Sequence, residues 1–122
     1  MNRRHHLILA AALGLAGALG AGLAHATSGG KAAVIVEQDI EYQPDEQTIH
    51  AGQAIRVENK DPFEHKTRVT RLKPDGSLGS MAVAGHVDKP GTSFTFTLDE
   101  PGTYEIRCLL HDGMAAVIKV VK

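Results

Sequence analysis

Short segments in which apolar and polar residues alternate follow one another along most of the chain after residue 31. Ile55 and Val57, for example, alternate with Arg56 and Glu58, which is the period of a strand with one face in a core. Turn-forming residues such as Lys73-Pro74-Asp75-Gly76 separate these segments. No window has helical spacing, so the pattern predicts an all-β fold.

Seven segments have the length and pattern of strands. They are residues 33–37, 48–51, 54–59, 67–72, 93–98, 103–108 and 117–121. About seven to eight short strands at this spacing predict a Greek-key β-sandwich or barrel. Residues 74–91 form the least regular part, which we expect to be a loop or to hold one short strand.

The N-terminus has the features of an export signal. Arg3 and Arg4 precede an apolar stretch at residues 7–23, and Ala24-His25-Ala26 offers small residues for cleavage. We therefore predict a signal peptide at residues 1–26 and one periplasmic domain at residues 27–122. A retained membrane anchor is the alternative, but the glycines and alanines of this stretch make a poor spanning helix.

The composition of the remaining domain excludes some partners. Without the two arginines of the leader, 11 basic residues face 14 acidic ones. This acidic balance predicts no nucleic-acid partner. The domain is large enough for one small core, and we expect a monomer that is not inserted in a membrane once the leader is removed.

A single cysteine, Cys108, raises a different question. Exported proteins commonly use cysteines in pairs, because the oxidising compartment favours disulfides. One thiol must instead be buried and inert, paired between chains, or bound to a metal.

The residues after Cys108 favour the metal. Cys108 ends a strand with its side chain toward the core, and His111 and Met114 follow at intervals of three. His65, between two predicted strands, is the best fourth ligand. Two imidazoles, a thiolate and a distant thioether form the ligand set of a blue-copper centre. Each residue alone is better explained as an ordinary core or surface side chain, so the prediction rests on their combination.

The stretches GTYEIRCLLHDGM and VIKVV, together with AGQAIRVENKD upstream, resemble the cupredoxins. Within that family, the short Cys-to-Met loop is similar to that of the amicyanins, whereas plastocyanins and pseudoazurins have a longer one. The resemblance implies one type 1 copper ion with His65, Cys108, His111 and Met114 as ligands.

Three positions depart from the family pattern. Lys66 replaces the usual asparagine after the first histidine, Leu109-Leu110 replaces Thr-Pro or Ser-Pro, and Ala115-Ala116 replaces a Met-Lys-Gly or Met-Arg-Gly run. The first two normally connect the ligand loops by hydrogen bonds, which fix the direction of the ligands. We therefore expect a weaker connection here.

The resemblance implies an exported carrier that passes single electrons between redox partner proteins and is not an enzyme. An amine dehydrogenase and a cytochrome c are the partners that the amicyanin likeness suggests. A copper-delivery protein of the same fold is the first alternative, and a metal-free interaction module is the second. A multicopper oxidase domain is disfavoured, because the histidines for a trinuclear cluster are missing.

Two surface features complete the expectations. Pro62-Phe63, Leu109 and Leu110 either form an exposed apolar patch beside His111, where family members dock their partners, or turn inward. Met81 and His86 either contribute to a second, weaker metal contact or are ordinary loop residues.

Overall fold

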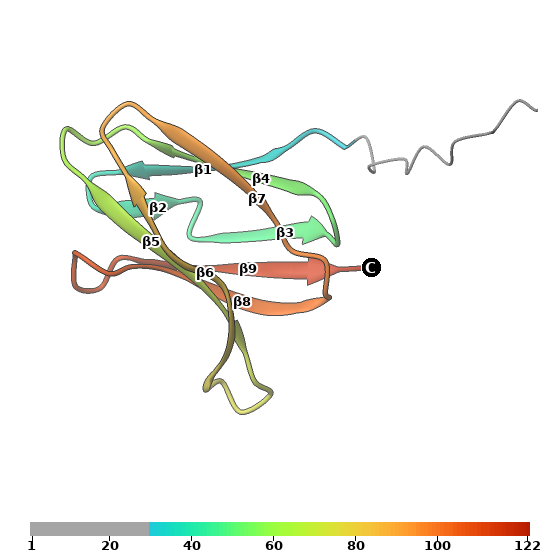
Figure 1. Ribbon diagram of the computed structural model, residues 1–122. Coiled ribbons are helices and arrows are strands. Elements are labelled where there is room, and N and C mark those ends of the chain that lie inside the picture. The colour runs from blue at the N-terminus through green and yellow to red at the C-terminus, as the bar shows by residue number, and fades with distance from the viewer. Residues whose placement is uncertain (1–29) are drawn as a thin grey trace, which may run out of the picture.

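Two β-sheets pack against each other in the computed structural model, which describes residues 30–122 (Figure 1). The first sheet has the strand order β2 (Glu41–Gln43), β1 (Ala33–Gln38), β4 (Ala54–Asn59) and β7 (Ser93–Thr97). The second has the order β3 (Glu46–His50), β9 (Ala115–Val121), β8 (Gly102–Cys108), β5 (His65–Leu72) and β6 (Leu78–Asp88). The predicted all-β sandwich is therefore confirmed, while the predicted leader lies outside the described residues.

The described part has nine strands, one more than the upper end of the predicted range. One addition is β2, whose three residues are too few to show a period of two. The other is β6, an 11-residue strand within the stretch that was expected to be a loop or one short strand. The pairing of β5 with β6 contains three register shifts, and such bulges break the alternation along a strand.

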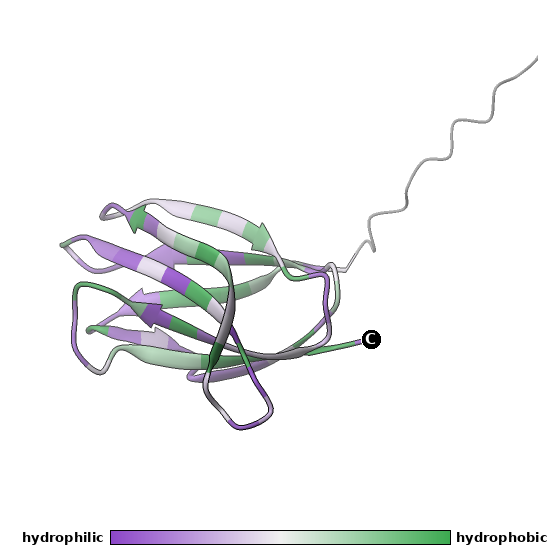
Figure 2. Cartoon of the chain, turned by 60° about the horizontal axis from the view of Figure 1, so that its bottom comes forward, coloured by the Kyte–Doolittle hydropathy of each residue, from purple (hydrophilic) through white to green (hydrophobic). Residues whose placement is uncertain are grey.

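The alternation along the other strands builds the core. Ile35, Ile55, Ile106 and Ile118 have at most 2% of their surface exposed, and they come from both sheets. Apolar and polar residues alternate along the strands in Figure 2. Burying each of these side chains contributes roughly 1.5–3 kcal/mol, so the two inner faces hold the sheets together.

Four connections meet at one end of the sandwich, on the left in Figure 1. They are the β1–β2 turn and the loops at residues 60–64, 89–92 and 109–114. Hydrogen bonds join them to one another or to adjacent strand ends, for example from the backbone amide of Asp39 to the carboxylate of Asp61 at 2.8 Å. Residues distant in the sequence are thereby held together at this end.

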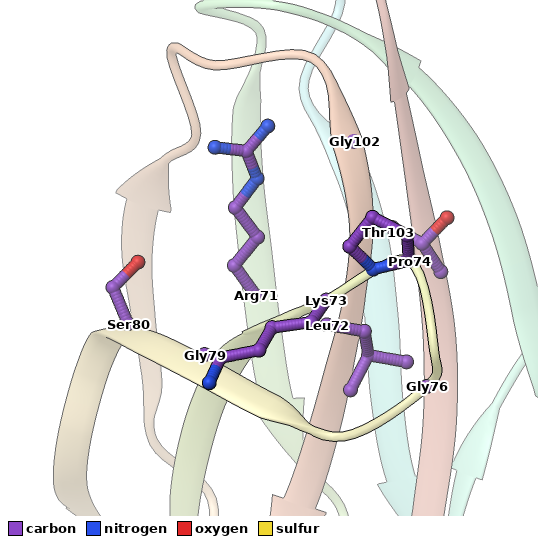
Figure 3. A pocket seen from close by; sticks show the side chains of 9 residues that line it. All are labelled: Arg71, Leu72, Lys73, Pro74, Gly76, Gly79, Ser80, Gly102 and Thr103. Atoms are coloured by element: carbon purple, nitrogen blue, oxygen red, sulfur yellow. The ribbon is translucent and has the colours of Figure 1, made fainter.

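A hollow of about 750 Å³ lies at the base of the hairpin between β5 and β6 (Figure 3). Residues of that hairpin line it together with Gly102 and Thr103 at the start of β8. His65 and Cys108 lie at the other ends of β5 and β8, so the hollow is remote from the predicted copper site. Within residues 30–122, no helix is long and apolar enough to span a bilayer.

Candidate metal centre

Cys108 is the last residue of β8, and 3% of its surface is exposed. Tyr104 and Ile106 are buried on the same face, as the period of two predicts. The backbone amide of Leu110 donates to Cys108 Sγ at 3.4 Å. The cysteine of the described chain is thus a buried, unpaired thiol whose sulfur is held at the end of a strand.

His65 is the first residue of β5 and is completely buried. Its Nδ1 atom lies 3.7 Å from Cys108 Sγ. Its Nε2 atom lies on the other side of the ring, 2.8 Å from a carboxylate oxygen of Asp61. The ring therefore presents Nδ1 to the sulfur.

His111 completes a triangle of donor atoms from the loop between β8 and β9. Its Nδ1 atom lies 3.4 Å from Cys108 Sγ and 3.2 Å from His65 Nδ1. A point equidistant from the three atoms is about 2.0 Å from each, close to the length of metal–imidazole and metal–thiolate bonds. These three residues form the cluster of metal-ligating groups among the described residues.

Met114 ends the same loop with 2% of its surface exposed. Its carbonyl oxygen accepts a hydrogen bond of 3.0 Å from the backbone amide of Cys108, so the loop closes on itself. The structure therefore brings together all three predicted imidazole and thiolate donors, and it buries the predicted thioether in the loop that carries His111 and directly follows Cys108.

Comparison with known proteins agrees with this donor set. A model of the plastocyanin/azurin family of copper-binding proteins matches residues 30–121. The chain belongs to this family. It is a cupredoxin, and its cofactor is one type 1 copper ion, for which the clustered imidazoles and thiolate are suitable donors.

Individual relatives support the assignment. Plastocyanin of Solanum crispum is 31% identical over 83 residues, which cover 65% of this chain and 84% of that protein. Chloroplastic plastocyanin of Oryza sativa subsp. indica is 30% identical over 81 residues, or 65% of this chain. Those residues span about half of the rice protein, 53% of its length. A reduced amicyanin variant has a similar fold, with a TM-score of 0.62, 24% identity and coverage of 80% of this chain and 88% of that one.

In this cupredoxin, the start of β5 and the loop after β8 are joined through the backbone. The amide of Leu109 donates to the carbonyl oxygen of Lys66 at 2.8 Å. We expected a weaker connection because the usual side chains are replaced at these positions. A backbone hydrogen bond does not depend on the side chains, and it joins the residues that directly follow His65 and Cys108.

The side chains of Asn59 and Asp61 form the hydrogen bonds that hold the loop before His65. The sequence analysis did not predict a role for either residue. Asn59 donates to the carbonyl oxygens of Phe63 at 2.9 Å and Asp88 at 2.8 Å, and its own oxygen accepts from the amide of Asp61. Burial opposes ionisation of Asp61, but hydrogen bonds from the amides of Ile40 and Asp39 and from His65 outweigh it and lower the pKa of this carboxyl. The Asn-x-Asp run in the sequence was the available signal.

A second buried polar group lies beside the copper site. The Thr67 hydroxyl lies 2.9 Å from Tyr42 Oη, 2.9 Å from Glu37 Oε1 and 2.5 Å from Asp88 Oδ2. Three contacts between oxygens need three protons, and the two hydroxyls supply two. One of the two carboxyls therefore holds a proton. Burial, followed by the neighbouring Asp88 carboxyl, raises the pKa of Glu37 to about 9.

Apolar side chains surround the edge of the site. Phe63, Leu109, Leu110 and Val87 are each between 37% and 54% exposed. The ring of Phe63 lies 5.4 Å from the rings of both His65 and His111, measured between centroids. The residues of the expected patch, Pro62, Phe63, Leu109 and Leu110, are exposed rather than turned inward. Val87 was not part of that expectation. We refer to Phe63, Leu109, Leu110 and Val87 as the apolar rim.

The predicted second metal contact is not formed among the described residues. His86 Nδ1 pairs with the Asp88 carboxylate, and the His86 ring stacks on Phe94 with 3.9 Å between centroids. Met81 is 62% exposed. His86 and Met81 are therefore ordinary residues of this segment, which was the alternative to a second metal contact.

Proposed function

We propose that this cupredoxin is an exported single-electron carrier in which His65, Cys108, His111 and Met114 bind the copper ion. When bound, copper supplies the Cu(II)/Cu(I) couple. The observation that carries the proposal is the triangle of His65 Nδ1, Cys108 Sγ and His111 Nδ1, with sides of 3.2, 3.4 and 3.7 Å.

The scaffold around these donors supports a fast electron step. His65 and Cys108 are buried at strand ends, and the residues directly after them are joined by the Leu109–Lys66 backbone hydrogen bond. Side chains held in this way move little when the charge of the centre changes. Little rearrangement leaves a small barrier to electron transfer, which suits a carrier.

The apolar rim supports a docking role. Its Phe63 ring lies 5.4 Å from the ring of His111, and Leu109 and Leu110 directly precede His111 in the chain. His111 is the most exposed of the three residues in the cluster. Electron carriers use small, short-lived interfaces, and exposed apolar side chains mark contact sites. We infer that partners dock at the rim and that the electron passes through His111. An amine dehydrogenase and a cytochrome c are still our predicted partners.

The leader features at residues 1–26 lead us to propose export to the periplasm, with residues 27–122 as the working domain and no enzymatic activity of its own. As an electron carrier, the domain would have to keep copper bound in both oxidation states.

Copper titration combined with electron self-exchange tests the proposal. A carrier takes up one Cu(II) per chain, becomes intensely coloured, bleaches reversibly with ascorbate, and exchanges electrons rapidly between its oxidised and reduced forms in nuclear magnetic resonance. A copper-delivery protein would instead prefer Cu(I), show weak colour and yield the ion to a chelator such as bathocuproine. That second pattern would overturn the proposal.

A further inference from the structure

Asp61 has an arrangement of hydrogen bonds that the copper ligands alone do not explain. It is 6% exposed and lies in the loop between β4 and β5, four residues before His65. Oδ1 accepts from the amide of Asp39 at 2.8 Å, and Oδ2 lies 3.2 Å from the amide of Ile40 and 2.8 Å from His65 Nε2. Both oxygens thus accept hydrogen bonds from N–H groups.

This arrangement defines the tautomer of His65. A carboxylate that accepts from two backbone amides has only acceptor capacity left for the imidazole. In the neutral imidazole, which is the form that binds a metal, the hydrogen is then on His65 Nε2 and the lone pair is on Nδ1. Nδ1 is the atom that faces Cys108 Sγ and His111 Nδ1. The hydrogen bond on one side of the ring thus prepares the other side to bind a metal.

The same carboxylate connects the ring to the opposite sheet. Asp39 and Ile40, in the turn between β1 and β2, have φ angles of 57° and 60°. Such left-handed backbone is unfavourable for a β-branched residue like Ile40, and the two hydrogen bonds to Asp61 stabilise it. The position of the His65 ring is thereby linked to a fixed turn of the first sheet.

We propose that Asp61 is the positioning residue of the copper site, which fixes the tautomer and direction of His65 and, through its negative charge, favours Cu(II) over Cu(I). The inference rests on the proposed function in one respect, that His65 is a ligand. Its charge acts on the ligand ring through a short hydrogen bond in a buried place, where it is weakly screened. Asp61 consequently lowers the reduction potential.

Asp61→Asn tests this role with little change of shape. Either orientation of the amide brings its NH₂ group against an N–H donor, because Oδ1 faces the amide of Asp39 and Oδ2 faces the amide of Ile40 and His65 Nε2. We expect the affinity for Cu(II) to fall about 10- to 100-fold and the reduction potential to rise. Asp112→Asn removes an exposed carboxylate beside His111, and it should change the affinity by about twofold or less because solvent and salt screen that charge.

The tautomer itself is measured without copper and without any variant. A long-range ¹H–¹⁵N spectrum of the metal-free protein with the natural sequence should show His65 with its hydrogen on Nε2, and Asp61→Asn should reduce that population. A hydrogen on Nδ1 in the protein with the natural sequence would overturn the proposal, even if the variant failed to fold. Equal effects of the Asp61 and Asp112 variants on affinity and potential would also overturn it.

The two proposals can fail separately. A protein with the expected His65 tautomer that forms no coloured copper complex would contradict the electron-carrier function and leave the positioning of the ring by Asp61 intact. A coloured, reversibly reducible protein with the other tautomer would contradict only the role of Asp61.

Discussion

His65 and His111 are 46 positions apart in the sequence, yet their Nδ1 atoms lie 3.2 Å apart. The sandwich brings them together because β5 begins at the end of the molecule where β8 terminates, and these two strands pair antiparallel in the same sheet. Thr67 and Cys108 are opposite each other in that pairing. The site therefore follows from the register of two neighbouring strands, and each prediction below changes one contribution to it.

Met114→Leu should preserve the colour of the copper protein and raise its reduction potential. Leucine has nearly the volume of methionine, so the buried position should lose less than about 1.5 kcal/mol of stability. If Met114 binds copper as proposed, its thioether would be a weak donor that tunes the potential, while the thiolate and the two imidazoles would hold the ion. Voltammetry and an absorption spectrum check both parts. Loss of the visible band in this variant would contradict the proposed role of Met114 as a weak ligand.

Leu110→Glu should slow electron self-exchange at least about tenfold while the reduction potential changes little. Leu110 is 54% exposed in the apolar rim, and two molecules that meet at this surface would bring like charges together. Leu78→Glu is the matched control, because Leu78 is 49% exposed on the hairpin remote from the site. Equal slowing in both variants would show that net charge, rather than the rim, controls the encounter.

Glu37→Gln should make the fold less sensitive to alkaline pH. The pKa of Glu37 is raised from 4.5 to about 9 by burial and by Asp88. Its contribution to stability is therefore fully present below pH 4.5 and is lost as the pH rises to about 9. The loss is at most about 1.4 kcal/mol per pH unit for one group. Glutamine resembles the protonated acid and should not show this loss.

Thermal unfolding of the metal-free proteins at pH 5, 7 and 9 measures the effect. We expect the natural and Glu37→Gln proteins to have similar melting temperatures at pH 5, with the variant increasingly more stable toward pH 9. Glu41→Gln, which changes an exposed carboxylate on the adjacent β2, is the control. A difference between the natural and Glu37→Gln proteins that stays constant across these pH values would contradict a protonated Glu37.

Local pattern was sufficient to predict much of the site. Residues two apart on a strand share a face, so the inward direction of Cys108 followed from Tyr104 and Ile106. The spacing of His111 and Met114 then indicated one loop. His65 was predicted from its place between two strand segments, but its distance from the sulfur depends on the pairing of β5 with β8, which only the fold shows.

The surroundings of the ligands could not be predicted in the same way. The hydrogen bond from Leu109 to Lys66 joins backbone atoms, so neither side chain encodes it. Glu37 and Thr67 are 30 positions apart and belong to different sheets. An acidic residue in an alternating strand is expected to face solvent, whereas Glu37 lies inward because Thr67 and Asp88 are there to pair with it. Such contacts depend on how the sheets pack.

The absorption and electron-spin-resonance spectra of the copper-loaded protein, recorded beside Cys108→Ser, test the ligand assignment most directly. The account predicts one Cu(II) per chain, an intense visible band from sulfur-to-copper charge transfer with a narrow copper hyperfine splitting, and loss of that band in the serine variant. A colourless Cu(II) complex of the natural sequence, or an intense band that survives Cys108→Ser, would contradict it.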